Sequence, residues 1–188
     1  MRSNKKIIIT VISVIVMSFV LGFVYDSLMT ASEKKSYPQK YKDEIAAASE
    51  KYGVPESKIY AVIKIESNFD SSSVSGKDAY GLMQLTAETY KDMSGLSEAE
   101  AAEKLPKLSD AENIMVGAKY LSWLHSRLES WDTVYAAYNA GIGNVLEWLK
   151  DPECSEDGKT LKYIPYPETR NYVRSVKNAE SIYLRLYK

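Results

Sequence analysis

The chain of 188 residues is long enough for one domain of ordinary size and a short appendage. Its 24 basic and 25 acidic residues give a net charge of -1, which excludes the basic footprint typical of nucleic-acid-binding domains. The single cysteine, Cys154, excludes an intrachain disulfide, so no disulfide partner is evident. The only histidine, His125, lies far from Cys154 in sequence, so the sequence predicts no zinc-type ligand cluster.

An uncharged apolar segment lies close to the N-terminus, over Ile7–Tyr25. Its nineteen residues are close to the ~20 that a membrane-spanning helix needs. Three basic residues precede it, Arg2, Lys5 and Lys6, and they predict that the N-terminus stays in the cytoplasm. The sequence therefore predicts a protein that crosses the cell membrane once and places its remaining residues on the extracytoplasmic side.

A cleaved signal peptide is the alternative for this segment, and it would make the protein secreted. The apolar run exceeds the ~7–15 residues usual in signal peptides, and Met29-Thr30-Ala31 is a poor cleavage site. The pattern therefore favours an uncleaved signal anchor over residues 1–28. We expect a polar linker over residues 29–40 and a domain over residues 41–188 to follow it.

Two helices are predicted to open the domain. The first covers Tyr41–Tyr52 and stops at Gly53, and Pro55 suits the first turn of the second. The second helix has an apolar face at helical spacing, and the next position on that face is a carboxylate, Glu66. The apolar residues of this face are Ile59, Val62 and Ile63.

The position of Glu66 gives it a candidate chemical role. A carboxyl group against an apolar wall is hard to ionise, so its pKa rises. A carboxylic acid with a raised pKa suits general acid catalysis near neutral pH. From this helix alone, the alternative is a glutamate at the helix end that reaches water, because glutamate is rarely fully buried.

A polar loop and a short glycine-containing block follow this helix. The loop of residues 70–78 contains four serines and Gly76, which is typical of a turn-forming segment. In the block that follows, Gly81 suits a tight backbone approach and Gln84 offers both a donor and an acceptor. Thr86 is the predicted N-cap of a helix over residues 87–93.

Helix signals continue through the middle of the domain. Ser97 and Glu100 have the spacing of a capping box, and so do Ser109 and Glu112, so each serine is predicted to start a helix. The second of these helices carries an apolar side formed by Ile114, Ala118, Leu121 and Leu128.

The last third of the chain is predicted to be helical as well. Asp132 is the predicted cap of a helix that ends in Ala136–Gly141, and residues 145–149 are expected to form a short apolar turn. A polar loop over residues 151–162 precedes a final helix over Glu168–Leu186. Because no strand pattern is found, the domain is predicted to be almost all α.

Three blocks of this sequence together resemble a known family. The first is Glu66-Ser67 at a helix end, followed by the serine-bearing loop and Gly81–Leu85. The second is Ala136–Gly141, and the third is Pro165–Val173. In this order they resemble the lytic transglycosylase domain of the soluble-lytic-transglycosylase (SLT), goose-lysozyme-like type. The resemblance covers about residues 41–188 and implies an all-α, lysozyme-like helical domain behind the N-terminal transmembrane helix.

The resemblance implies a reaction on the glycan strands of peptidoglycan. Glu66 would protonate the oxygen of the β-1,4 bond between N-acetylmuramic acid and N-acetylglucosamine. The resulting carboxylate would then accept the proton of the sugar's C6 hydroxyl, which attacks C1 and closes a 1,6-anhydro ring without consuming water. No metal and no organic cofactor is called for by the resemblance.

The resemblance also implies roles for residues around Glu66. Ser75 and Gln84 would hydrogen-bond the sugar or its acetamide, and Met83 would press on the sugar face. Tyr138 would orient Glu66 or touch the reacting sugar.

Three further positions match the family's pattern. Asn139 would help to shape the cleft. Tyr172 matches a tyrosine that faces the active site in the family, although tyrosine at this helical spacing is also ordinary core. Asn113 matches an asparagine that opens its helix, although a polar residue in a first turn also has a purely local explanation.

Two alternative functions are compatible with the sequence. One is a muramidase of the goose-type lysozyme class, in which water attacks and Asp70 or Asp78 acts as a second acid. The other is a non-catalytic wall-binding module tethered to the membrane. The intact Glu66 and the intact glycine-containing blocks argue against a decayed site.

Overall fold

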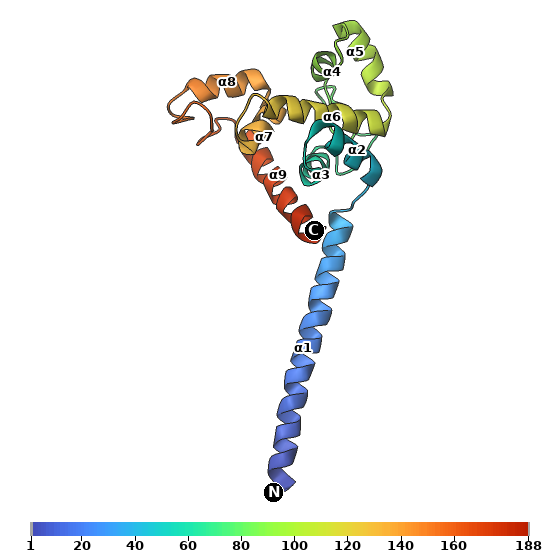
Figure 1. The fold of residues 1–188 in the computed structure, drawn as a ribbon, viewed down its shortest axis with the longest axis vertical. Helices are drawn as coiled ribbons and strands as arrows, with labels where there is room; N and C mark the ends of the chain where they lie inside the picture. Colours follow the sequence, from blue (N-terminus) through green and yellow to red (C-terminus); the bar gives the residue numbers. More distant parts are fainter. Residues whose placement is uncertain (1, 188) are drawn as a thin grey trace. The chain divides into compact units, whose positions relative to one another are not determined.

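The computed structural model describes residues 2–187, including the side chains of residue 10 and residues 12–187. The chain divides into two compact units, Met1–Pro38 and Gln39–Lys188 (Figure 1). The side chains of Arg2, Lys5 and Lys6, which predict a cytoplasmic N-terminus, lie outside the described part.

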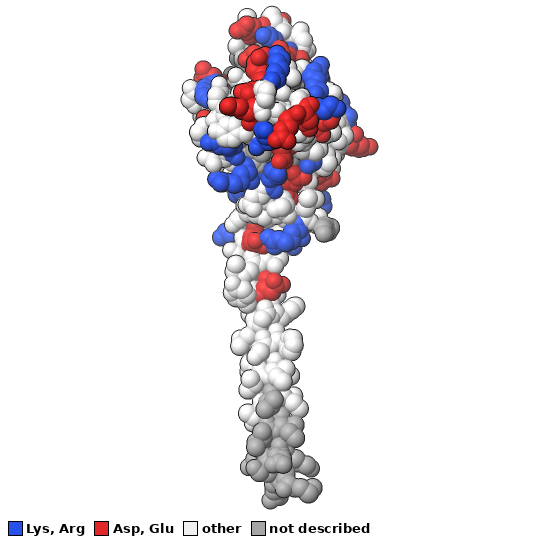
Figure 2. Space-filling view, turned by 90° about the vertical axis from the view of Figure 1, so that its left-hand side faces the viewer, with Lys and Arg blue, Asp and Glu red and all other residues white. Residues whose placement is uncertain are grey.

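The first unit is formed by one long helix, α1 (Arg2–Ser36). Its stretch Ile12–Ser36 is long and apolar enough to cross a membrane, by length and composition alone. The apolar side chains of this stretch are exposed, and Phe19, at 76%, is among the most exposed. Figure 2 shows the described part of this helix largely without charged side chains. The helical conformation continues through residues 29–36, within the segment that the sequence predicts as a linker.

The second unit is helical throughout its regular structure. Within residues 2–187 the only β-pairing consists of isolated bridges that join Tyr80 to Val74 and to Leu85. The helices of this unit are α2 (Lys42–Tyr52), α3 (Glu56–Glu66), α4 (Ala87–Ser94), α5 (Glu98–Lys104), α6 (Asp110–His125), α7 (Trp131–Ala140), α8 (Ile142–Lys150) and α9 (Pro167–Leu186), with a 3-10 turn at Leu105–Lys107. The domain is therefore all-α, as predicted.

The core is organised around the contact between α3 and α9, the most extensive between any two helices described. The ring of Tyr60 on α3 stacks on Tyr183 of α9, with centroids 5.0 Å apart. The apolar face predicted for α3 is fully buried, and each such aliphatic side chain contributes about 1.5–3 kcal/mol of stability by leaving water. α2 packs on both α3 and α6, and α7 packs on both α6 and α9, so each of the two central helices has a further helix against it.

Local sequence explains where several of these helices begin. The hydroxyl of Thr86 accepts a hydrogen bond from the amide of Thr89, which confirms Thr86 as the N-cap of α4. Both predicted capping boxes are present, with Ser97 starting α5 and Ser109 starting α6. Each cap contributes about 1 kcal/mol by satisfying amides that the helix leaves unpaired.

Two local predictions are wrong. Asp132 does not cap α7, because that helix already begins at Trp131 and the Asp132 carboxylate instead pairs with Lys177, 2.6 Å away. Residues 145–149 are not a short turn but lie in α8, a helix that follows α7 after Gly141. Gly141 ends α7 with a φ of 84°, a backbone conformation that favours glycine, and the chain enters α8 directly after it.

Candidate active site

Glu66 is the last residue of α3, and its side chain is part-buried. The chain leaves the helix abruptly because Asn68 and Phe69 both adopt left-handed backbone conformations, with φ of 52° and 64°. Such conformations are costly for residues other than glycine and persist where the surroundings enforce them. Here the buried ring of Phe69 supplies the anchor, since it packs 6.3 Å from the ring of Tyr60. The turn therefore holds Glu66 at a fixed place at the end of a rigid helix.

Burial raises the pKa of Glu66 to about 7. The cause is desolvation, which penalises the ionised carboxylate and which the apolar face of α3 makes unavoidable. One hydrogen bond acts against this rise in pKa. The hydroxyl of Tyr172 donates to Oε1 of Glu66 over 2.6 Å, which favours the ionised carboxylate and lowers the pKa of Glu66. A carboxyl group whose pKa lies this close to neutral pH is suited both to give and to take a proton.

Tyr172 reaches Glu66 from α9, and it is 8% exposed. Burial, and then the negative charge of Glu66, raise the pKa of Tyr172 well above its ordinary value. The phenol therefore keeps its proton at neutral pH and acts as a hydrogen-bond donor.

Tyr138 lies near the same carboxyl group but directs its proton elsewhere. Its hydroxyl donates to the backbone carbonyl of Met83 over 2.8 Å. Burial raises the pKa of Tyr138 well above its ordinary value, and the charge of Glu66 is the next contribution. The structure thus brings Glu66, Tyr138 and Tyr172 together from three different helices.

The loop that carries Met83 is held against α3 and α6 by side-chain hydrogen bonds. The hydroxyl of Ser67 donates to the carbonyl of Leu82 over 2.8 Å. The side chain of Asn113 bonds the loop twice, because its Oδ1 accepts from the amide of Met83 at 2.8 Å and its Nδ2 donates to the carbonyl of Tyr80 at 3.0 Å. Asn113 is 3% exposed, so this pair of bonds is shielded from water.

Gly81 is required at this point for two reasons. Its φ of 77° is a conformation that residues with a side chain rarely adopt, and a Cβ atom here would lie 2.5 Å from Nδ2 of Asn113. The close approach of the loop to Asn113 is therefore possible only with glycine.

The side chains of Gln84 and Ser75 form hydrogen bonds with the backbone of their own loop. The Nε2 amide of Gln84 donates to the carbonyls of Ser73 and Gly81 at 3.0 and 2.9 Å. The hydroxyl of Ser75 accepts from the amides of Lys77 and Ala79 at 3.2 and 3.1 Å. Both residues thus shape the loop beside Glu66 in this structure.

The role expected for the Met83 side chain needs correction. The side chain is 0% exposed, and a Cβ atom placed on Gly117 of α6 would lie only 2.3 Å from its sulfur. Met83 therefore packs into the core against Gly117 and cannot press on a sugar. What it presents toward the site is its backbone carbonyl, the acceptor for Tyr138.

A cleft of about 300 Å³ has Tyr138 in its wall, whereas Glu66 and Tyr172 are not among its lining residues. It contains Tyr138 and Asn139, and the Oδ1 of Asn139 is held by a 2.8 Å hydrogen bond from the hydroxyl of Thr169. Sequence reasoning missed Tyr120 and Trp123, although aromatic residues three apart on a helix are a signal for a shared face. The cleft is lined by Thr86, Glu88, Thr89, Asp92, Tyr120, Trp123, Tyr138, Asn139, Ala140, Gly141, Ile142 and Gly143.

The cleft suits a carbohydrate ligand. Three aromatic rings line the cleft and contact one another: the ring of Tyr120 stacks on that of Trp123 with centroids 5.9 Å apart, and its centroid lies 5.4 Å from that of Tyr138. Aromatic faces bind sugar rings while the polar groups at their edges take hydroxyls. Across residues 2–187, no group of three or more His, Cys, Asp or Glu side chains is placed to hold a metal ion.

Asp70 is one of the two carboxylates considered as a second acid. Its side chain forms hydrogen bonds within its own loop. Its Oδ1 accepts from the amide and the hydroxyl of Ser72, at 2.9 and 2.6 Å. The hydroxyl bond is the main cause that lowers the pKa of Asp70, so this group is ionised at neutral pH.

Comparison with known proteins identifies relatives of this chain. A family model described as "Transglycosylase SLT domain" matches residues 43–160. The "Membrane-bound lytic murein transglycosylase C" of Serratia proteamaculans is 34% identical over 169 residues, which cover 78% of this chain and 47% of that protein. The protein of the same name from Shigella sonnei is 32% identical over 168 residues, with the same shares covered. The chain thus spans about half the length of these relatives.

Solved structures show the same fold. An inactive mutant of the lytic transglycosylase Slt from Pseudomonas aeruginosa aligns with a TM-score of 0.64 and 32% identity, covering 81% of this chain and 25% of that one. The 70 kDa soluble lytic transglycosylase from Escherichia coli aligns with a TM-score of 0.64 at 24% identity, with the same shares covered. The predicted resemblance and the predicted lysozyme-like helical fold are therefore both confirmed.

Proposed function

Because the chain belongs to the transglycosylase SLT domain family, we propose that it is a membrane-anchored lytic transglycosylase of peptidoglycan. It cleaves the β-1,4 bond between N-acetylmuramic acid and N-acetylglucosamine and leaves 1,6-anhydro-muramic acid ends. The observation that carries the proposal is the environment of Glu66, a part-buried carboxyl with a pKa of about 7 that is hydrogen-bonded by Tyr172.

The first step is general acid catalysis. Protonated Glu66 gives its proton to the glycosidic oxygen, the bond from that oxygen to C1 of the muramic acid breaks, and the positive charge on C1 is shared with the ring oxygen. The pKa of about 7 supplies a protonated carboxyl at neutral pH, which a glutamate in water would not supply. The hydrogen bond from Tyr172 stabilises the carboxylate that this step produces.

The second step uses the same carboxylate as a base. Glu66 takes the proton of the C6 hydroxyl, the C6 oxygen forms a bond to C1, and Glu66 returns to its protonated form. The nucleophile belongs to the sugar that is being attacked, so its effective concentration is high and no bound water is needed. One residue that titrates near pH 7 serves both steps, and no metal or organic cofactor takes part.

The other residues act on position rather than on protons. Tyr138 holds the carbonyl of Met83 in place and contributes an aromatic wall to the cleft. Asn139 offers its amide group to sugar hydroxyls from the same wall. Gln84 and Ser75 keep the loop beside Glu66 in shape and bind the acetamide or hydroxyls when substrate enters.

The place of action follows from α1 in this proposal. Residues 1–28 anchor the protein in the cell membrane, residues 29–40 link the anchor to the domain, and residues 41–188 act on the extracytoplasmic side. Two observations support this: the apolar stretch of α1 has the length of a membrane span, and the relatives carry the word membrane-bound in their names. The alternative is a secreted domain released by cleavage of this segment.

The deciding experiment is mass spectrometry of products from purified peptidoglycan digested with the full chain in detergent. We expect muramic acid ends lighter by one water than ordinary reducing ends. Ends of ordinary mass would replace the proposal with a hydrolytic muramidase, and binding without turnover would replace it with a wall-binding module. Glu66→Gln should fold normally and release no product, whereas Glu50→Gln, an exposed change on α2, should match the parent.

A further inference from the structure

A second hollow, of about 350 Å³, lies in the Gln39–Lys188 unit and shares no lining residue with the cleft. One face of α9 forms part of its lining, the segment of residues 161–164 forms another part, and Asp132 of α7 completes it. We call it the basic groove. Its lining residues are Asp132, Leu161, Lys162, Tyr163, Ile164, Arg170, Val173, Arg174 and Lys177.

The wall of the basic groove is built by Arg170. Its Nη1 atom lies 2.5 Å from the carbonyl oxygen of Ile164, 3.0 Å from that of Pro165 and 3.2 Å from the hydroxyl of Tyr163. The guanidinium carbon also lies 5.1 Å from the centroid of the Tyr163 ring. One side chain therefore fastens the segment before α9 to the helix, so the groove is formed before any ligand arrives.

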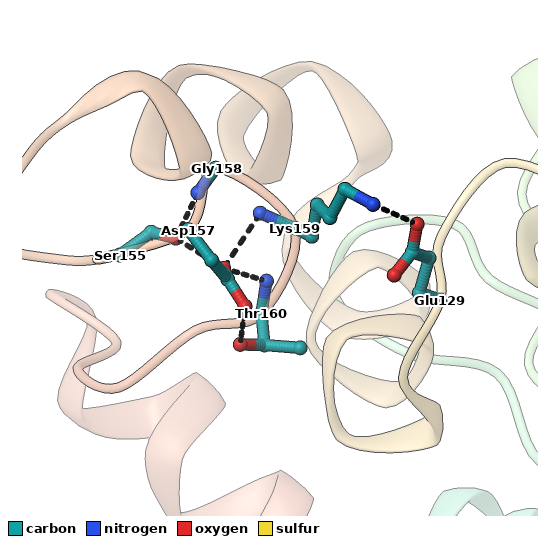
Figure 3. A network of polar contacts seen from close by, with 6 residues as sticks. All are labelled: Glu129, Ser155, Asp157, Gly158, Lys159 and Thr160. Carbon is teal, nitrogen blue, oxygen red and sulfur yellow. Dashed lines mark hydrogen bonds and ion pairs between the residues drawn. The ribbon is translucent and has the colours of Figure 1, made fainter.

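The loop that leads into this wall is tied down as well, as Figure 3 shows. The carboxylate of Asp157 accepts hydrogen bonds from the amides of Lys159 and Thr160, each at 2.8 Å. These bonds hold the pKa of Asp157 well below its ordinary value, so the carboxylate stays charged and keeps its partners. The ammonium group of Lys159 pairs with Glu129 at 2.8 Å, which joins the loop to the segment before α7.

The charges of the groove do not cancel. Lys177 is paired with Asp132 at 2.6 Å, and Lys162 is paired with Glu156 at 2.9 Å. Arg170 and Arg174 instead bond to neutral acceptors, and that of Arg174 is the Oδ1 of Asn171 at 2.9 Å. Two guanidinium groups thus carry positive charge that no carboxylate balances in the ion pairs recorded for the described residues. Such groups bind carboxylates through planar, two-point hydrogen bonds.

The groove is not purely cationic, and this narrows the class of ligand. Leu161, Ile164 and Val173 provide apolar surface, and the ring of Tyr163 is 49% exposed beside them. A short peptide with carboxylates and small apolar side chains satisfies both parts. A polyphosphate chain fits less well, because it gains nothing from the apolar surface.

We propose that the basic groove binds the peptide stems of peptidoglycan, which are short peptides that carry carboxylates and alanine methyl groups. The cleft then holds the glycan while the groove holds a stem of the same polymer. The identity of the polymer rests on the proposed function, but the binding of a carboxylate-bearing peptide does not. Binding to the groove therefore favours peptide-bearing strands over bare glycan.

The binding test uses the full chain in detergent micelles and a synthetic stem tetrapeptide, measured by titration calorimetry. We expect saturable binding that is lost when the carboxylates of the peptide are amidated. Arg174→Gln should weaken binding about tenfold, the size of one lost charge-assisted contact. Lys162→Gln should weaken it in the same direction, whereas Lys104→Gln, an exposed cation on α5, should bind as the parent does. Arg170 is left intact because it holds the wall.

The kinetic test compares peptide-bearing strands with glycan strands from which the peptides have been removed. Arg174→Gln should raise KM for the peptide-bearing strands, leave kcat unchanged, and leave both constants unchanged for bare glycan. A parent that cleaves neither substrate would refute the proposed function, while the calorimetry would still decide the groove. The proposal is overturned if the peptide does not bind, if the amidated peptide binds equally, or if poly(glycerol phosphate) competes more tightly than the peptide.

Discussion

At the scale of single residues, the candidate chemistry depends on a carboxyl group and two phenols that come from three helices. Burial destabilises the ionised form of Glu66 and raises its pKa, and the hydrogen bond from Tyr172 partly offsets this effect. Tyr138 and Tyr172 keep their protons because burial raises the pKa of each well above the ordinary value. The balance between desolvation and one hydrogen bond therefore places the titration of Glu66 near pH 7.

The raised pKa of Glu66 predicts that stability depends on pH. The pKa is about 7 in the folded protein and 4.5 as the reference value, so the native state binds more protons between these values. The free energy of unfolding therefore falls as pH rises through this window, by up to about 3 kcal/mol. Glu66→Gln cannot titrate, so it should match the parent near pH 4, become progressively more stable than the parent as pH rises above about 4.5, and keep the full difference above about pH 7.

Urea denaturation of the full chain across this range measures the effect. Glu50→Gln, on the exposed side of α2, should follow the parent at every pH. Parent and Glu66→Gln curves that stay parallel across the range would show that Glu66 is not desolvated in solution.

Removing the hydroxyl of Tyr172 should shift the activity profile. The hydrogen bond lowers the pKa of Glu66, so Tyr172→Phe should raise it, move the alkaline limb of the pH–rate profile upward, and reduce kcat roughly tenfold because the carboxylate loses its donor. The matched control is Tyr60→Phe, since the buried hydroxyl of Tyr60 has no hydrogen-bond partner among the described residues. A Tyr172→Phe profile that overlays the parent's would remove this role.

At the scale of elements, the loop of residues 80–85 links α6 to the residues around Glu66. Asn113 binds this loop through both ends of its amide, and Tyr138 binds it from α7. With the hydrogen bond from Ser67 at the end of α3, the loop joins three helices at one place. It has almost no regular structure of its own, so its shape depends on these side chains.

Gly81→Ala tests this dependence. The added Cβ would lie 2.5 Å from Nδ2 of Asn113, and the φ of 77° at this position is strained for alanine. Either the loop must move or the hydrogen bonds of the Asn113 side chain must break. We expect a loss of about 1–3 kcal/mol in the free energy of unfolding and a larger fractional loss of activity than of stability. Gly76→Ala is the control, because no atom lies within 4 Å of the added carbon there. Equal behaviour of the two variants in denaturation and cleavage assays would refute the argument.

At the scale of the whole molecule, the chain combines a unit made of one apolar helix with a helical domain whose surface carries charges of both signs (Figure 2). The large side chains of the Ile12–Ser36 stretch are exposed, which a protein in water does not sustain over this length. A bilayer covers such a surface, and this is the physical reason for proposing an anchor.

Membrane extraction tests the anchor. The full chain expressed in bacterial cells should remain in the membrane fraction after washes with high salt or carbonate and should leave it with detergent, because apolar burial and not charge holds it. Intact-mass measurement should find residue 1 or 2 at the N-terminus. A soluble product that begins near residue 32 would identify a cleaved signal segment instead.

The sequence by itself determined those features that depend on neighbours a few residues away. The starts of α4, α5 and α6 follow from Thr86, Ser97 and Ser109, since a capping hydroxyl bonds amides two or three positions ahead. The apolar length of α1 and the place of Glu66 on an apolar face are equally local. The family blocks then predicted the fold, which the comparisons confirm.

Only the tertiary structure decided how the side chains meet. The bond between Tyr172 and Glu66 joins residues 106 positions apart, and the desolvation that sets the pKa of Glu66 depends on atoms from distant parts of the chain. Met83 was expected at the sugar face but lies in the core, because Gly117 on a helix far along the chain leaves room for its sulfur. Local patterns cannot reveal such an outcome, since packing and desolvation are properties of the surroundings and not of the residue alone.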